Sequence, residues 1–241
     1  MPDSKNHLKC GDSIGKALAK AIRAVIGCHQ KQADAVFSAL NGRPIPFDEE
    51  QCEEGPNAGK SAKEKLDAAL AKLGPSGKNL CSAKQLMQAA ARETTLFAGK
   101  TTTGSLDALN GQIYCDGTSS VDFGGDDAGT IDANGLTGKL KLKCADTVGR
   151  ELGKLAAAVT HCHQKQADAM FAGKGFVEEV CEESDPVKHK SALEKYRAAM
   201  TKLDGKGLCQ QACLSPANRD TLGTSILSQI ENANQVAYPC P

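Results

Sequence analysis

The chain has 241 residues, of which 40% are hydrophobic and 24% charged, enough for one large domain or two modest ones. Lysine and arginine total 29, as do aspartate and glutamate, and there are no tryptophans, three tyrosines and six phenylalanines. This composition excludes a charge-driven attraction to nucleic acid or to an anionic membrane, and it leaves few rings to stack on bases. No apolar run approaches the roughly 20 residues that span a bilayer, so we expect neither a nucleic-acid partner nor a membrane span.

Eleven cysteines are many for a chain of this size, and none forms the CxxC pair of zinc ribbons or thioredoxin-like redox sites. Wide, regular spacing favours disulfides, which persist in oxidising compartments. We therefore expect an extracellular, cell-surface or periplasmic protein. Residues 1–6 do not resemble a signal peptide, so we expect that one has been removed.

The cysteines divide the chain into two copies of one unit. Their intervals are 18, 24 and 29 residues in the first copy and 18, 19 and 28 in the second. CHQKQAD recurs unchanged at residues 28–34 and 162–168, and FDEEQCEE at 47–54 recurs as FVEEVCEE at 176–183. The matched cysteines are Cys10, Cys28, Cys52 and Cys81 in the first copy, and Cys144, Cys162, Cys181 and Cys209 in the second.

Each copy opens with a segment of helical period. Apolar residues recur at alternating steps of four and three through residues 10–28 and 144–162, and the pattern continues to about Leu40 and Ala172. Eighteen residues advance a helix by about 27 Å and five whole turns. The two cysteines of this helix therefore share one face but cannot bond to each other.

A second helix follows in each copy. Capping-box signatures mark its start at Ser61 with Glu64 and at Ser191 with Glu194. The unit is thus predicted to be an antiparallel helical hairpin. Two cysteine pairings remain open in each copy, and the antiparallel arrangement favours the one that joins the ends of the two arms. It pairs Cys10–Cys81, Cys28–Cys52, Cys144–Cys209 and Cys162–Cys181.

Shorter elements complete the predicted all-α fold of two tandem disulfide-stapled hairpins. We expect extra helices over residues 82–92 and from about Pro216, and an irregular Gly/Asp-rich linker at 116–143 between repeats at 1–115 and 144–241. Cys115 and Cys240 follow similar runs, NGQIYC and NQVAYPC, so the tail is expected to repeat too. We favour a Cys213–Cys240 disulfide, with Cys115 left over.

The Cys-His pairs at Cys28-His29 and Cys162-His163 are the sharpest candidate site. Together with the preceding cysteine they form C-x17-CH, which loosely resembles long-spacing variants of the c-type haem motif. Five helical turns between the cysteines argue against two thioether bonds to one porphyrin. We therefore expect disulfide-bonded cysteines beside solvent-facing histidines, no cofactor, and an intact fold after mutation of His29 and His163.

A divalent cation is the other alternative. The Cys28–Cys52 disulfide would bring His29 and Lys31 toward four glutamates, and the second copy would do the same for His163 and Lys165. Such clusters of carboxylates are more often solvated acidic residues at the N-terminus of a helix than metal sites. The glutamates are Glu49, Glu50, Glu53 and Glu54, and Glu178, Glu179, Glu182 and Glu183. The aspartates of residues 122–132 lack EF-hand spacing, and we interpret them as a flexible linker.

No motif of a hydrolase, a zinc protease or a nucleotide-binding enzyme is present, so we predict that the chain is not an enzyme. The order C-x17-CH, Cys, Ala/Lys-rich helix and Gly-x-x-x-Cys resembles tandem cysteine-rich helical repeats of predicted exported bacterial proteins, over residues 10–81 and 144–209. That resemblance implies export and repetition. We favour a structural or interaction protein of a cell-surface or extracellular assembly, with a protein partner or self-assembly. The alternative is a haem, metal or small-molecule carrier.

Overall fold

The computed structural model describes residues 4–117, 120–133 and 135–238. The regular structure of the described part is helical apart from two short strands, in agreement with the predicted all-α class. Its elements are α1 (Lys5–Leu40), α2 (Glu49–Glu53), α3 (Ala62–Ala71), α4 (Ala83–Leu96), α5 (Leu106–Ile113), β1 (Ser120–Asp122), β2 (Thr130–Asp132), α6 (Gly135–Phe171), α7 (Glu178–Glu182), α8 (Ala192–Asp204), a 3-10 turn (Ala212–Leu214) and α9 (Pro216–Ala237).

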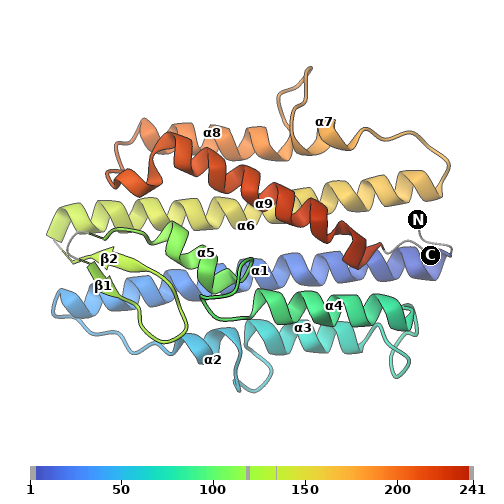
Figure 1. Cartoon of the computed structure of the whole chain (residues 1–241), viewed down its shortest axis with the longest axis horizontal. Coiled ribbons are helices and arrows are strands. Elements are labelled where there is room, and N and C mark those ends of the chain that lie inside the picture. The colour runs from blue at the N-terminus through green and yellow to red at the C-terminus, as the bar shows by residue number, and fades with distance from the viewer. Residues whose placement is uncertain (1–3, 118–119, 134, 239–241) are drawn as a thin grey trace.

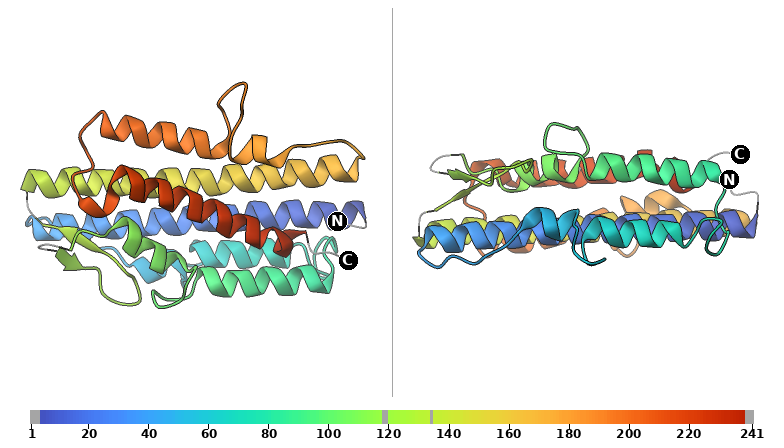
Figure 2. Two further views of the ribbon diagram at one scale, coloured as in Figure 1. Left: turned by 45° about the horizontal axis from the view of Figure 1, so that its top comes forward. Right: turned by 90° about the horizontal axis from the view of Figure 1, so that it is seen from below.

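The helices form two layers (Figure 2). One layer holds the long helices α1 and α6 side by side and antiparallel, with α3 outside α1 and α8 outside α6 (Figure 1). The second layer, made of α4, α5, α9 and the antiparallel β1–β2 hairpin, covers one face of the first (Figure 2). The two copies of the repeat therefore lie about a pseudo-twofold axis that passes between α1 and α6.

Contacts across the central helix pair repeat with this symmetry. The side-chain amide of Gln30 donates to the backbone oxygen of Asp146, and that of Gln164 donates to the backbone oxygen of Asp12. Each glutamine and each aspartate is separated from its counterpart by the 134 residues that separate Cys10 from Cys144. The buried apolar residues of both copies form one hydrophobic core, so this region does not divide into separate cores at the linker.

The tail of each copy crosses to the other copy. The Tyr114 hydroxyl, at the end of α5, donates to the Asp146 carboxylate of α6 over 2.7 Å. The Tyr238 hydroxyl, after α9, donates to the equivalent Asp12 carboxylate of α1. The predicted repetition of the tail is therefore visible in the structure, and the crossing explains why α1 and α6 are held together.

Five disulfides are present in the described residues, which is typical of an oxidising compartment. Four are the predicted disulfides that join the two arms of each hairpin, which we call rungs: Cys10–Cys81, Cys28–Cys52, Cys144–Cys209 and Cys162–Cys181.

The fifth disulfide corrects a prediction. Cys213 bonds to Cys115 rather than to Cys240, and Cys115 is not left over. Cys240 lies outside the described residues. The tail that ends at Cys115 crosses to the second copy, which brings Cys115 to Cys213. Spacing within one copy could not predict this pairing.

Other elements agree with the sequence in outline. Both capping boxes form, at the starts of α3 and α8. The third cysteine of each copy, Cys52 or Cys181, lies on a short helix, α2 or α7. We expected a loop between the two helices of the hairpin at this point. The linker contains the β1–β2 hairpin, and its last residues already belong to α6. None of the described helices combines the length and apolarity needed to cross a membrane.

Candidate metal centres

The first centre is built around His29, which follows Cys28 on α1. The Cys28–Cys52 disulfide fixes α2 against α1 at this point. Asp48 caps α2 by accepting a hydrogen bond from the Gln51 backbone N–H. Glu49 and Glu53, at the two ends of α2, are four residues apart and share one face of the helix. The disulfide therefore places both carboxylates beside the His29 imidazole.

Two aspartates reach the same imidazole from the second layer. Asp107 lies in the first turn of α5, after the N-cap Ser105. Asp127 lies in the loop between β1 and β2, where the Gln32 side chain donates to its carboxylate over 2.6 Å. Lys100 anchors this loop through hydrogen bonds from its side chain to the backbone oxygens of Asp127 and Gly125. We call His29, Glu49, Glu53, Asp107 and Asp127 the His29 centre.

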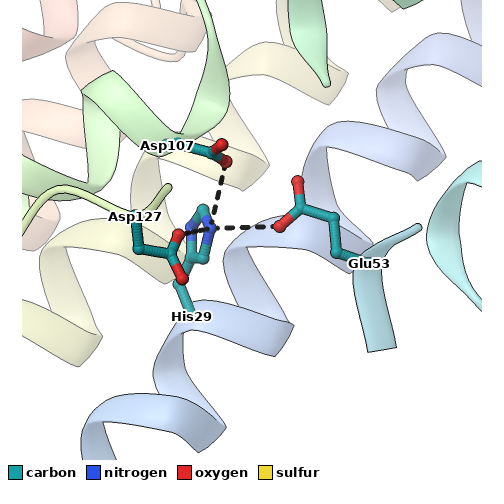
Figure 3. Close-up of side chains that lie close together, drawn as sticks. All are labelled: His29, Glu53, Asp107 and Asp127. Atoms are coloured by element: carbon teal, nitrogen blue, oxygen red, sulfur yellow. Dashed lines mark ion pairs between the residues drawn. The ribbon is translucent and has the colours of Figure 1, made fainter. Parts of the chain in front are cut away.

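The carboxylates of Glu53, Asp107 and Asp127 approach the His29 imidazole from different sides (Figure 3), and ligand atoms of these four residues lie within 4.8 Å of one another. His29 Nε2 lies 3.1 Å from Asp127 Oδ1, 3.2 Å from Glu53 Oε2, and 3.6 Å from both Glu49 Oε1 and Asp107 Oδ1. Atoms bound at about 2.1 Å to one metal ion are about 3.0 Å apart at right angles and about 3.4 Å apart in a tetrahedron. The nitrogen–oxygen separations of 3.1 and 3.2 Å fall between these values, and the two of 3.6 Å lie slightly above them.

The hydrogen bond from Gln32 to Asp127 leaves several polar atoms of the centre unaccounted for. His29 Nε2 and one oxygen of each of the four carboxylates are buried without a hydrogen-bond partner among the described residues. All five side chains are less than 9% exposed, and no lysine or arginine of the described part pairs with any of them. Buried carboxylates without a counter-ion are costly, so the centre requires a cation or protons.

The pKa values show how the cluster takes up protons when no cation is bound. Burial and the neighbouring Glu53 raise the pKa of Glu49 to about 11, and burial raises the pKa of Asp107 to about 6. Burial lowers the pKa of His29, but the carboxylates around it outweigh burial and raise it well above its usual value. Burial opposes ionisation of Asp127, yet His29 and Gln32 hold its pKa below the usual value. At neutral pH a divalent cation would have to displace the Glu49 proton and a proton from His29.

A second centre occupies the equivalent position in the other copy. The Cys162–Cys181 disulfide fixes α7 against α6, and His163 Nε2 lies 3.2 Å from Glu178 Oε1 and 3.0 Å from Glu182 Oε1. These three residues, the His163 centre, can present their ligand atoms within 4.8 Å of one another. Both carboxylate oxygens are buried without a hydrogen-bond partner among the described residues.

Glu231 of α9 is the counterpart of Asp107 in the second copy. Each of the two residues precedes the tyrosine that ends its tail, Tyr238 or Tyr114, by the same number of positions. Burial and the nearby carboxylates of Glu183 and Glu178 raise the pKa of Glu231, whereas His163 lowers it. Glu231 therefore lies within electrostatic reach of the His163 centre. Its carboxylate makes no direct contact with His163 in the described structure.

The structure corrects the sequence-based description of these histidines. We expected them to face solvent, but His29 is 2% and His163 4% exposed. Each histidine lies about 100° further round the helix than the cysteine before it, and α2 or α7 covers that side of the helix. The thiols required for haem attachment at Cys28 and Cys162 are consumed in disulfides.

Half of the predicted glutamates join the centres. Glu49, Glu53, Glu178 and Glu182 do so, whereas their neighbours Glu50, Glu179 and Glu183 are exposed and Glu54 pairs with Lys63. Lys31 and Lys165 also remain exposed.

Sequence reasoning missed Asp107 and Asp127. Asp127 was assigned to a flexible linker, yet it is 3% exposed. The match between the two tails, which aligns Asp107 with Glu231, was the available signal for Asp107. The described residues contain one such hairpin, so no repeat pointed to Asp127.

Comparisons with protein-family models, with curated proteins and with solved structures found no match to this chain.

Proposed function

We propose that this chain is a metal-binding protein of an oxidising compartment outside the cytoplasm, with one divalent transition-metal ion in the His29 centre and one in the His163 centre. Of the two classes of function that the sequence left open, structural protein or carrier, the geometry favours the carrier. The observation that carries the proposal is the set of four buried carboxylates around His29 Nε2, each with one oxygen that has no hydrogen-bond partner among the described residues and none paired with a lysine or arginine there.

The donor set indicates the class of metal. Imidazole nitrogen suits Zn²⁺ and Fe²⁺, carboxylate oxygen suits Mn²⁺, and the hard cations Ca²⁺ and Mg²⁺ prefer oxygen ligands alone. Each centre combines one imidazole with carboxylates. We therefore expect Mn²⁺, Fe²⁺ and Zn²⁺ to bind in preference to Ca²⁺ and Mg²⁺ at equal concentration.

The disulfides have a direct role in this function. Each rung beside a histidine, Cys28–Cys52 or Cys162–Cys181, holds a helix of five residues that would not persist alone. Reduction would free α2 and α7 and release two carboxylates from each centre. Metal binding should therefore depend on the oxidised state of the chain.

Titration calorimetry of chelator-treated, oxidised protein with Zn²⁺ and Mn²⁺ tests the proposal. We expect two ions per chain in the wild type. The isosteric variant Glu49→Gln/Glu53→Gln should bind one ion, because it removes two ligand charges of the His29 centre. The matched control Glu50→Gln/Glu54→Gln changes the adjacent, outward-facing pair and should still bind two. The proposal is wrong if the wild type binds neither metal, or if the two variants bind alike.

A further inference from the structure

The two centres differ in the carboxylates that reach the histidine. Both copies supply a histidine and two glutamates from a disulfide-fixed helix, but the tail residue Asp107 lies against His29 whereas its counterpart Glu231 makes no direct contact with His163. Among the described residues, the first copy alone also receives Asp127, from the loop of the β1–β2 hairpin between the copies. Figure 1 shows the hairpin on the α2 side of the molecule, far from α7.

The His163 centre is also less buried than the His29 centre. The side chain of Glu49 is 8% exposed, whereas that of its counterpart Glu178 is 23% exposed. Within the described residues, only Glu178 and Glu182 form ion pairs with His163, compared with four carboxylates for His29. The His163 centre is therefore both poorer in ligands and closer to solvent.

Ligand number determines whether water can join a metal ion. Mn²⁺ favours six ligand atoms, and structural centres are closed by protein ligands whereas reactive ones keep a position for water or substrate. The His29 centre offers five side chains, of which the carboxylates can each supply one or two oxygens. The His163 centre offers three side chains, or four if Glu231 turns inward.

We infer that the His163 centre holds its metal ion with an open coordination position, filled by exchangeable water and available to an external oxygen-donor ligand, while the His29 centre is closed by Asp127. This inference rests on the proposed metal-binding function. It assigns the His29 centre to holding the fold together and the His163 centre to exchange of metal or binding of a small ligand.

Water-proton relaxation by bound Mn²⁺ tests the inference, since Mn²⁺ relaxes water strongly only when water enters its coordination sphere and exchanges. Glu49→Gln/Glu53→Gln leaves only the His163 centre able to bind, and Glu178→Gln/Glu182→Gln leaves only the His29 centre. Each substitution is isosteric and removes like-charge repulsion, so both variants should fold. Free Mn²⁺, measured by electron paramagnetic resonance, is subtracted so that relaxivity is expressed per bound ion.

We expect the relaxivity per bound ion at the His163 centre to be at least about twofold that at the His29 centre. Adding Asp127→Ala to Glu178→Gln/Glu182→Gln should raise the low value, because water would take the vacated position of the His29 centre. Equal relaxivities at the two centres, or no rise with Asp127→Ala, would overturn the inference while leaving metal binding intact. A wild type that binds no Mn²⁺ or Zn²⁺ would instead overturn the proposed function.

Discussion

The disulfide between Cys115 and Cys213 joins the two copies, and its removal should have a calculable effect on stability. In Cys115→Ser/Cys213→Ser the fold should persist, because the Tyr114–Asp146 hydrogen bond and the shared core remain. The loss should arise in the unfolded chain, which gains freedom when the link is cut.

The magnitude depends on the other disulfides. Cys115 and Cys213 are 98 residues apart, a loop for which the chain-entropy relation gives about 4.7 kcal/mol. However, the Cys144–Cys209 disulfide is also present in the unfolded chain and shortens the path between Cys115 and Cys213. That path runs through about 29 residues from Cys115 to Cys144, across the disulfide, and through about four residues from Cys209 to Cys213. The effective loop of about 33 residues corresponds to about 3.7 kcal/mol at 25 °C.

Urea unfolding without reductant, followed by circular dichroism, measures this difference, and non-reducing peptide mapping verifies that the other four disulfides are intact. We expect the free energy of unfolding to fall by about 3.7 kcal/mol. A fall of less than about 1 kcal/mol would refute the reasoning, because it would mean that the link restricts the unfolded chain little or strains the native one.

Three further predictions concern buried residues outside the metal centres. Burial raises the pKa of Asp146 to about 7, above its unfolded value of about 4, so the free energy of unfolding should fall as pH rises from 4 to 7. The variant Asp146→Asn still accepts the hydrogen bond from Tyr114 but does not titrate. It should therefore remove that part of the pH dependence in urea titrations. Ser191→Ala should lower the free energy of unfolding by about 1 kcal/mol through loss of the capping box with Glu194, whereas an unchanged value would show that the cap contributes nothing. Leu152→Ala, at a fully buried site on α6, should lower it by about 2–5 kcal/mol, and a smaller loss would mean that the core closes around the cavity.

The helices and four of the disulfides could be predicted because they depend on short stretches of chain. A helix repeats every 3.6 residues, a capping box spans four, and both signals are complete within α3 or α8. The pairing of Cys10 with Cys81 needed only one more premise, that the arms of each hairpin are antiparallel. Because the same pattern occurs in both copies, each assignment could be checked against its counterpart.

The metal centres depend on contacts that no single copy contains. His29 is buried because α2 closes over it on one side and α5 and the β1–β2 loop close over it on the other. Those last two elements take their positions from the crossing of the tails and the antiparallel packing of α1 on α6. Asp127 and the Cys115–Cys213 disulfide follow from the same packing. Local sequence carries no signal for an arrangement set by side chains that meet across about a hundred residues of chain. The sequence alone thus determined the main helices and the four disulfides within the copies, and only the tertiary structure decided which carboxylates surround each histidine.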